Sequence, residues 1–357
     1  PKPEGGTVAF FSCSEGQKAY ENEKAGRGFF TDSVIRGLLG AAANKEGEVT
    51  IPLLEDFLQK DVPSAVKRVK GLNIRQTPER LGDLRGRTLL AKVAPGTSPD
   101  APLKGGEERE FEIHKEVKMK FCWIPAGEAQ LGSQKEEQDN VTKKNKDGKR
   151  PFSLDEETEA ARGKFKTTGF WLGKYEVTQQ EWKGVLDNNP SRFRGDKLPV
   201  ERISWIDCQT FIKKCEVKGF KLELPHENQW EYACRGGLGN KQPYYWGDSL
   251  NGDKANCMGI FPFGTTTEGV ALLRTTEVGN YERVAPHPWG LCDMHGNVAE
   301  WCENVRTTKG PGQVIRGGRY NRDAENCRSA RRDWTSPSSK YDSVGCRLLL
   351  LPLAEDK

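Results

Sequence analysis

Residues 288–304 read PWGLCDMHGNVAEWCEN, a stretch in which glycine, tryptophan and acidic residues follow one another closely. Short apolar runs separated by glycines continue on both sides of this stretch, and all nine tryptophans of the chain lie beyond residue 108. Frequent glycines between short apolar runs are typical of loops and short strands rather than of long regular elements. We therefore expect an irregular domain over residues 109–357.

Three acidic residues of this region lie among aromatic residues: Glu176 in GKYEVT, Glu231 in QWEYA and Glu300 in NVAEW. A carboxylate in apolar surroundings must be hydrogen-bonded or bound to a metal. Arg235 and Arg316 precede glycine pairs, where backbone with positive φ could let a guanidinium reach such a carboxylate. The pattern predicts that these charges form the scaffold of the core.

Length and charge limit the possible classes of protein. A chain of 357 residues can form two domains, each with its own core. Its 55 basic and 51 acidic residues are interspersed and leave a net charge of +4, which does not indicate nucleic acid or an anionic membrane as a partner. The longest uncharged apolar run, residues 348–354, is far shorter than the ~20 residues of a membrane span.

Ten scattered cysteines without a CxxC pair, and no signal-peptide pattern, favour a soluble protein of a reducing cytoplasm. The four histidines form no HxH or HExxH motif, which disfavours a metal hydrolase.

The first 93 residues have a different pattern. Strand-like runs over 7–13 and 88–93 flank amphipathic, helix-like runs over 30–43 and 51–69, an order that predicts α/β packing. Residues 94–108 are rich in Pro, Gly, Ser and charge, which is typical of a linker.

Within the second region, residues 133–166 are highly charged and nearly free of aromatic residues. Such a composition buries too little apolar surface to pack against a core. We therefore expect a solvated, partly disordered insertion.

Four strings of the first region, at residues 10–21, 26–40, 44–58 and 75–79, resemble the C-terminal half of a caspase or metacaspase domain. In that family the catalytic histidine and cysteine lie in the larger, upstream half, and residues 1–93 contain no histidine. The resemblance implies that an upstream caspase-like large subunit is a partner, and that this region alone has no catalytic residue. Cys13 corresponds to a structural strand position.

In metacaspases, an acidic residue of the motif corresponding to residues 10–21 lines a pocket for basic side chains. By position, Glu21 would take that role, with Glu15 as a second candidate. Both residues are equally compatible with ordinary solvated loop carboxylates.

From Phe121 onward, ten motifs occur in the order found in formylglycine-generating enzymes and their sulfatase-modifying relatives. They are FCWIPAGEAQLGS, GFWLGKYEVTQQEW, NPSRF, LPVERISWIDC, LELPHENQWEYACRGG, YYWGD, KANC, PWGLCDMHGNVAEWCEN, VIRGGRY and CRSARRD with VGCRLLL. The resemblance implies an α+β fold related to C-type lectins, preceded by the α/β caspase-like subdomain.

The resemblance also implies calcium, a hard cation that prefers oxygen ligands. One implied set of ligands is Asp293, Gly296, Asn297, Val298 and Glu300. A second set, in a loop that departs from the acidic pattern of the family, is Asn256, Cys257, Glu268 and Val270.

Copper is not expected. The enzymes of the family hold it between two cysteines that follow the RGG motif, because copper(I) requires soft thiolates. Arg322 occupies the place of the first cysteine, and the nearby Cys327 has no partner thiol in this string. A family disulfide is also incomplete, since Ser329 lies where the partner of Cys234 is expected.

The segments 319–326 and 333–342 lie between framework motifs and are rich in the side chains that antibody paratopes use. They resemble the variable segment of diversity-generating-retroelement proteins, which ends in a GFR-like string, here GCR at 345–347. The predicted ligand-binding residues are Arg319, Tyr320, Asn321, Arg322, Asp323, Asn326, Asp333, Trp334, Ser336, Ser338 and Tyr341. A generic polar loop is the open alternative.

We expect a lectin-like domain that displays a variable surface, binds a protein ligand and is coupled to a caspase-like protease module. Two alternatives stay open. One is a copper-dependent formylglycine-generating oxidase, and the other is a cysteine protease specific for basic residues once its larger half is present.

Overall fold

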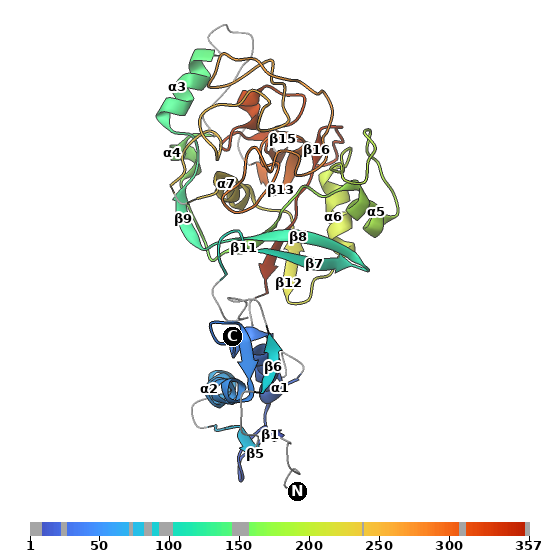
Figure 1. Cartoon of the computed structure of the whole chain (residues 1–357). Coiled ribbons are helices and arrows are strands. Elements are labelled where there is room, and N and C mark those ends of the chain that lie inside the picture. Colours follow the sequence, from blue (N-terminus) through green and yellow to red (C-terminus); the bar gives the residue numbers. More distant parts are fainter. Residues whose placement is uncertain are drawn as a thin grey trace. The chain divides into compact units, whose positions relative to one another are not determined.

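The computed structural model describes residues 9–22, 27–70, 74–81, 88–92, 103–144, 157–237, 239–306 and 312–353. The described residues form two compact units, one ending at Lys92 and one beginning at Leu103 (Figure 1). The predicted linker covers residues 94–108. Its residues 94–102 lie outside the described residues, and its residues 103–108 belong to the larger unit.

The smaller unit contains two helices and short strands. Its elements are β1 (Ala9–Phe11), β2 (Glu21–Asn22), β3 (Arg27–Gly28), α1 (Phe29–Arg36), β4 (Glu48–Thr50), α2 (Ile51–Lys70), β5 (Glu79–Leu81) and β6 (Leu89–Lys92). The described strands pair two by two and antiparallel, β1 with β5, β2 with β3 and β4 with β6. The smaller unit is thus a mixture of helices and strand pairs, as its alternating pattern predicts.

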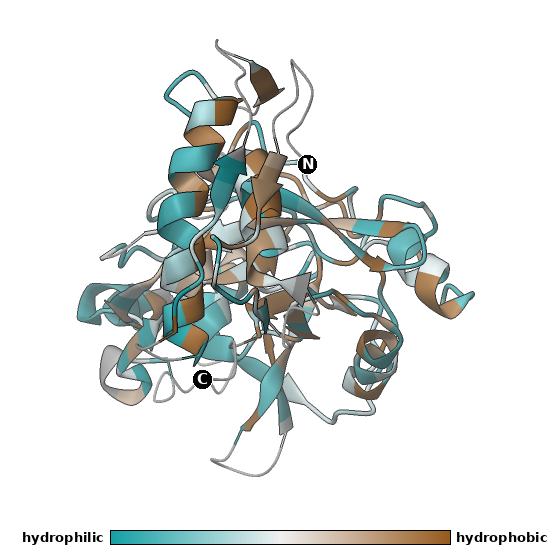
Figure 2. Cartoon of the chain, turned by 90° about the horizontal axis from the view of Figure 1, so that it is seen from below, coloured by the Kyte–Doolittle hydropathy of each residue, from teal (hydrophilic) through white to brown (hydrophobic). Residues whose placement is uncertain are grey.

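Helix α2 buries one face. Figure 2 shows hydrophilic and hydrophobic residues alternating along the helices. The buried residues of α2 recur every three or four positions, the spacing of a single helical face: Ile51, Leu54, Leu58, Val62 and Val66.

The helix expected over residues 30–43 is not uniform. Helix α1 ends at Arg36, and a π-helical turn follows over Gly37–Ala41. A β-carbon at Gly37 would lie 2.5 Å from Cδ1 of Leu54, so the absence of a side chain there lets α2 approach closely.

The larger unit has many short strands. They are β7 (Glu108–His114), β8 (Val117–Ile124), β9 (Gly127–Gln130), β10 (Lys164–Thr167), β11 (Phe170–Gly173), β12 (Phe220–Glu223), β13 (Ala299–Arg306), β14 (Gly312–Arg316), β15 (Asp333–Thr335), β16 (Val344–Gly345) and β17 (Leu349–Pro352). One sheet has the order β12-β17-β11-β8-β7 and another the order β15-β14-β13-β16, while β9 pairs with β10. The C-terminal strand β17 therefore lies inside the first sheet, between β12 and β11.

Helices of the larger unit are short: α3 (Lys135–Lys144), α4 (Glu159–Arg162), α5 (Gln179–Leu186), α6 (Trp205–Lys214), α7 (Glu227–Arg235) and a 3₁₀ turn at Ala324–Cys327. Capping boxes begin α5 at Thr178, α6 at Ser204 and α7 at His226. Between α7 and β13 the described residues form neither helix nor strand, as the glycine-rich sequence predicts.

The core of the larger unit is aromatic. Trp171, Trp182, Trp230 and Trp301 are each buried to below 2 % exposure. All ten cysteines are free thiols. No helix among the described residues is both long and apolar enough to cross a lipid bilayer.

The charged segment 133–166 differs from its prediction where the structure describes it. It contains α3, α4 and the first part of β10, and it buries two carboxylates, Glu137 and Glu157. Both carboxylates pair with the buried guanidinium of Arg328. Because Arg328 comes from a distant part of the chain, composition alone could not show that these charges have a buried partner.

Candidate ligand-binding surface

The residues predicted to bind a ligand differ in exposure. The exposed ones are Arg322, Trp334, Ser336, Ser338 and Tyr341. The half-buried ones are Asn321, Asp323, Asn326 and Asp333. Arg319 and Tyr320 are buried.

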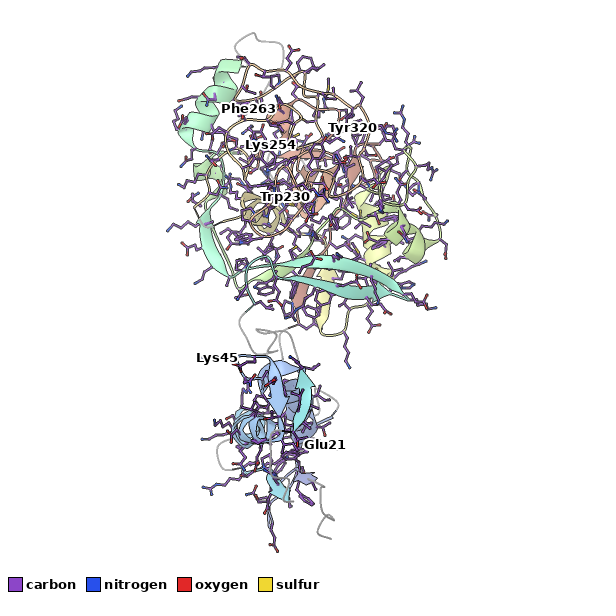
Figure 3. All side chains as sticks on the ribbon, in the orientation of Figure 1. Glu21, Lys45, Trp230, Lys254, Phe263 and Tyr320 are labelled. Atoms are coloured by element: carbon purple, nitrogen blue, oxygen red, sulfur yellow. The ribbon has the colours of Figure 1, made fainter. Side chains whose placement is uncertain are left out.

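Tyr320 and Arg319 hold loops together instead of facing solvent. Tyr320, marked in Figure 3, is 3 % exposed, and its ring meets Phe193 edge to face at 5.7 Å. Burial, with a smaller contribution from Asp342, raises the pKa of Tyr320 to about 12. Nη2 of Arg319 lies 2.9 Å from Oδ2 of Asp333. Only the exposed residues of the predicted set are therefore open to a partner.

The exposed aromatic residues lie on β15 and on the turn that follows it. Trp334 is 42 % exposed, with the guanidinium carbon of Arg306 3.3 Å from its ring centroid. Tyr341 is 44 % exposed and its hydroxyl lies 3.3 Å from Oγ1 of Thr335. A cation stacked on one side of Trp334 fixes the indole, so the residue can act as a rigid anchor.

Helix α6 adds a residue that the sequence did not single out. The backbone N–H of Ile206, in its first turn, donates to the carbonyl of Pro337 at 3.5 Å, and its side chain is 52 % exposed. Lys340 also reaches Asp207 at 2.7 Å. We call Ile206, Trp334, Ser336, Ser338 and Tyr341 the C-terminal face. Only the fold reveals the contribution of Ile206, since it is 128 positions before Trp334.

The region that corresponds to the copper cysteines of the family contains a contact between thiols that the sequence did not predict. Arg322 is exposed, and its carbonyl accepts the N–H of Met258 at 2.8 Å. The thiol of Cys327 shares a hydrogen bond with that of Cys257, and this contact and burial raise the pKa of Cys327 well above its usual range. Both thiols are buried, at 0 % and 1 % exposure. A second thiol is thus beside Cys327, but neither faces solvent.

In the first calcium set, protein donors engage the side chains. Both oxygens of Glu300 accept from Nε of Arg347 at 3.0 Å, and one accepts from Nε1 of Trp230 at 2.7 Å. Oδ1 of Asn297 accepts from Asn256 at 3.2 Å and from the N–H of Thr276 at 3.0 Å.

Of these side chains, Asp293 alone keeps an oxygen without a hydrogen bond, since Gly279 donates to Oδ2 only. The other ligands implied there, Gly296 and Val298, offer carbonyls. Most side-chain oxygens of this set thus already accept hydrogen bonds from protein donors.

The second calcium set contains a buried oxygen without a donor. Oδ1 of Asn256 accepts no hydrogen bond, while its Nδ2 donates to the carbonyl of Arg274 at 2.9 Å. The carbonyls of Cys257 and Val270 converge on the N–H of Gly259, each at 3.0 Å. Glu268 is exposed two positions before Val270. The two carbonyls are thus engaged by Gly259, whereas the buried oxygen of Asn256 is open to a donor or a cation.

Among the described residues, no three His, Cys, Asp or Glu side chains gather as metal ligands. A calcium ion in either set would therefore need amide and carbonyl oxygens in addition to carboxylates.

The predicted charge scaffold is confirmed. Glu231 accepts from Nη2 of Arg235 at 2.8 Å and from the N–H of Gly132 at 2.7 Å, and it also pairs with Arg316. Burial alone would raise the pKa of Glu231, but the guanidinium groups of Arg235 and Arg316 lower it to about 2. Glu176 accepts from Nδ2 of Asn297 at 2.6 Å. These carboxylates are thus held by buried partners inside the domain.

In the smaller unit, Glu15 lies in the turn after β1 and Glu21 lies in β2, and both are exposed. The loop between them is held by Gln76, which accepts from the N–H of Tyr20 at 2.9 Å and donates to the carbonyl of Ser12 at 3.0 Å. The structure therefore leaves both candidate carboxylates open to solvent.

Comparison with known proteins identifies the family of the larger unit. The sequence model of the sulfatase-modifying factor enzyme 1-like domain matches residues 109–351. A formylglycine-generating enzyme of Streptomyces coelicolor is 33 % identical over 171 residues, which cover 42 % of this chain and 51 % of that protein. An inactive Cα-formylglycine-generating enzyme 2 of Mus musculus is 31 % identical over 162 residues, covering 42 % of this chain and 48 % of that protein. The chain thus spans about half the length of these relatives.

Two solved structures share the fold. Treponema denticola variable protein 1 is 22 % identical with a TM-score of 0.50, and the match covers 68 % of this chain and 98 % of that one. PvdO from Pseudomonas aeruginosa is 20 % identical with a TM-score of 0.51, over 69 % of this chain and 98 % of that one. The larger unit therefore has the C-type-lectin-like fold of this group.

Proposed function

Because this chain belongs to the sulfatase-modifying factor enzyme 1-like domain family, we propose that its lectin-like unit binds a protein ligand through the C-terminal face. The exposure of Trp334 on edge strand β15 carries this proposal. An indole held by Arg306 loses little conformational freedom on binding, and the hydroxyls around it can adapt to a partner.

The chemistry of the face supports a protein rather than a small ligand. Its aromatic and hydroxyl groups lie along a strand and a turn, and its aliphatic group lies at the start of α6. Neither Trp334 nor Tyr341 lines any of four cavities found among the described residues. Small ligands usually occupy concave sites, whereas protein partners cover exposed aromatic anchors.

The test uses a displayed library of folded protein scaffolds, selected against the whole chain. Binders are then measured against Trp334→Ala, Tyr341→Ala and, as an exposed aliphatic residue outside the face, Val284→Ala. Binders that lose about tenfold or more in affinity with the first two variants, and none with the third, support the proposal. Binders that tolerate both aromatic changes contradict it.

We further propose that the residues of the C-terminal face between Arg316 and Arg347 are diversified. In that case, the gene has a near-copy of the segment encoding Arg316 to Arg347 that differs only at adenines, beside a reverse transcriptase. Sequencing the neighbouring DNA decides this point.

The smaller unit is proposed to be the C-terminal part of a caspase-like protease, so that recognition triggers or localises proteolysis. Its helices and strand pairs and the buried Gln76 that orders the loop of Glu15 and Glu21 support this reading. An upstream coding segment with a histidine and an Asp-Cys pair, together with cleavage after basic residues, is the expected finding.

The contact between Cys257 and Cys327 favours a second candidate function, the copper-dependent oxidase. Two thiols can ligate copper(I), but both are closed to a peptide substrate. Incubation with copper and a CxPxR-type peptide should leave the cysteine unchanged if the first proposal holds, whereas an aldehyde product would support the oxidase.

For calcium, we propose the second set, with Asn256 as its central ligand. Its unpartnered buried oxygen and the two neighbouring carbonyls support this choice.

A further inference from the structure

A small pocket lies where β14 ends and where β13 and β15 begin. The charged residues that line it are four arginines and one aspartate: Arg316, Arg319, Arg322, Arg331 and Asp333. We call it the basic pocket. It shares no residue with the C-terminal face, and the proposed function assigns no role to it.

Salt bridges leave positive charge in excess in the basic pocket. Three of its arginines have an acidic partner: Arg319 pairs with Asp333, Arg331 with Glu157 and Arg316 with Glu231. Two of these carboxylates are shared, because Glu157 also pairs with Arg328 and Glu231 with Arg235. The fourth arginine, Arg322, is exposed and pairs with no carboxylate among the described residues. Like charges held together repel each other, so an anion in this pocket would relieve the repulsion.

Arg319 and Arg322 lie close enough to act on each other. Burial lowers the pKa of Arg319; Asp333 opposes that shift, and the charge of Arg322 adds to it. Nη1 of Arg319 donates to Oγ of Ser343 at 3.5 Å, which is a long hydrogen bond. Nε of Arg316 is buried and has no acceptor in the part of the chain that the structure describes. The pocket thus contains guanidinium donors that an acceptor from outside could satisfy.

The size of the basic pocket favours a carboxylate over a phosphate or sulfate. Its enclosed space is about 20 Å³. One water molecule needs on the order of 10–15 Å³, so this space holds roughly one or two oxygen atoms. A carboxylate presents two oxygens in a plane, which suits neighbouring guanidinium groups. Arg319 has little exposed surface, but the pocket extends to it, so a single narrow group can enter where the surface of a partner cannot.

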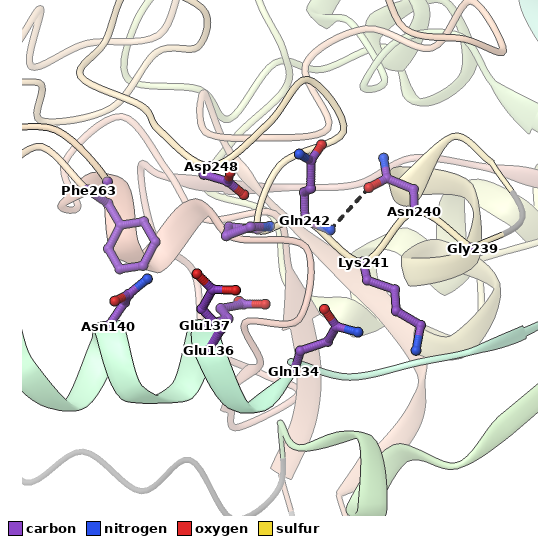
Figure 4. Close-up of a pocket in the computed structure, with 12 residues that line it drawn as sticks. Gln134, Glu136, Glu137, Asn140, Gly239, Asn240, Lys241, Gln242, Asp248 and Phe263 are labelled. Carbon is purple, nitrogen blue, oxygen red and sulfur yellow. Dashed lines mark hydrogen bonds between the residues drawn. The ribbon is translucent and has the colours of Figure 1, made fainter.

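Charge separates the basic pocket from a larger cavity, of about 700 Å³, between α3 and the loops that follow α7. Figure 4 shows Glu136 and Glu137 of α3 on one side of that cavity and Asp248 on the other. An acidic group is repelled by these carboxylates and attracted by the arginines of the basic pocket. Of these two spaces, the basic pocket is therefore the one that suits a carboxylate.

The basic pocket is within reach of a partner on the C-terminal face. Hydrogen bonds with Thr335 and Ser339 lower the pKa of Tyr341, and the charge of Arg319 adds to that shift. Arg319 therefore lies near Tyr341, which is exposed. A protein that covers Tyr341 can thus place one of its side chains in the pocket.

We infer that the basic pocket receives the side chain of an aspartate or glutamate of the protein that binds the C-terminal face. The carboxylate accepts hydrogen bonds from the guanidinium groups of Arg319 and Arg322. The amide of Asn326, which also lines the pocket, can donate another. This inference rests on the proposed function and names the chemistry that its ligand must carry.

The test uses the full chain and N-acetylaspartate N-methylamide as the probe, with the asparagine derivative and inorganic phosphate as comparisons at equal ionic strength. Asparagine has nearly the shape of aspartate without its charge. The Nε–H signals of the arginines, followed by NMR, should shift and saturate with the aspartate derivative at millimolar concentration. The asparagine derivative should bind about tenfold more weakly or less. Equal binding of the two derivatives, no saturation by the aspartate derivative, or phosphate binding as tightly as it does would overturn the inference.

Two variants of opposite sign locate the site. Arg322→Gln removes an exposed guanidinium and should weaken the aspartate derivative by about fivefold or more. Asp333→Asn removes the carboxylate that engages Arg319 and should strengthen binding by about threefold or more. Arg283→Gln, at an exposed position outside the pocket, is the matched control and should have no effect. Unchanged affinity in both pocket variants, or an equal loss in the control, would overturn the inference.

The inference and the proposed function can fail separately. The binders selected for the proposed function report on Trp334 and Tyr341, whereas the aspartate derivative reports on the basic pocket. Binders that lose affinity with Trp334→Ala, together with an aspartate derivative that does not bind, would overturn this inference and leave the proposed function standing.

Discussion

Oγ of Ser329 lies 3.6 Å from Sγ of Cys234 in the core of the larger unit, with Nε2 of His295 also 3.6 Å from the same sulfur. The family resemblance implies a disulfide at this pair of positions, and the chain keeps one cysteine and replaces the other by serine. Burial raises the pKa of the Cys234 thiol to about 12, so the thiol is unreactive as it stands.

Ser329→Cys should therefore restore a disulfide with Cys234. The two positions are 95 residues apart, and closing a loop of that length stabilises a protein by about 2–4 kcal/mol when the geometry is unstrained. Refolding with oxidised glutathione should remove two free thiols and raise Tm, and a reductant should reverse both changes. Ser329→Ala, refolded in the same way, is the control. A variant that keeps all its thiols under these conditions would contradict the alignment of this pair.

Tyr320 and Tyr341 should differ in their effect on stability. Tyr320→Ala removes a ring buried against Phe193 and should cost about 3 kcal/mol, as do other aromatic deletions in cores. Tyr341→Ala, at an exposed position, should change stability by less than about 0.5 kcal/mol. Urea denaturation measures the free energy of unfolding of both variants. Equal losses of this free energy would mean that Tyr320 is more accessible than the structure shows.

The loop-rich fold could be predicted because ten motifs occur in the order of a known family. The charge scaffold could be predicted because its acidic and basic residues lie within those motifs. Arg235 and Glu231 are four positions apart on one helix, so their pairing follows from local geometry. The partners of Arg328 and the place of Tyr320 could not be predicted in this way. Whether a polar residue in a loop faces solvent depends on which distant segment covers it.

Calcium provides a test that separates the two predicted ligand sets. We expect calcium to raise Tm and EGTA to lower it. Asn256→Ala should abolish the difference, and Glu268→Gln should reduce it, because both changes remove oxygens of the second set. Asp293→Asn should leave the difference in place. Should Asp293→Asn abolish it while Glu268→Gln has no effect, the ion occupies the first set.

Glu201 should make the protein less stable as the pH rises toward neutrality. Its carboxylate is fully buried; Oε1 accepts from the N–H of Phe193 at 2.9 Å and Oε2 has no partner. Burial raises its pKa from 4.5 to about 7, although the N–H groups of Phe193 and Arg192 oppose the shift.

A pKa raised by folding means that the folded state holds its proton more tightly than the unfolded state does. The resulting stability is complete below pH 4.5 and is lost as the pH rises through 7. Glu201→Gln keeps a neutral side chain at every pH, so it should remove this decline. Thermal unfolding should be measured between pH 5 and pH 8. The Tm of the variant relative to that of the natural chain should rise by about 3 °C or more from the lower to the upper end of this interval. A difference in Tm that is constant over this interval would assign the decline to another group.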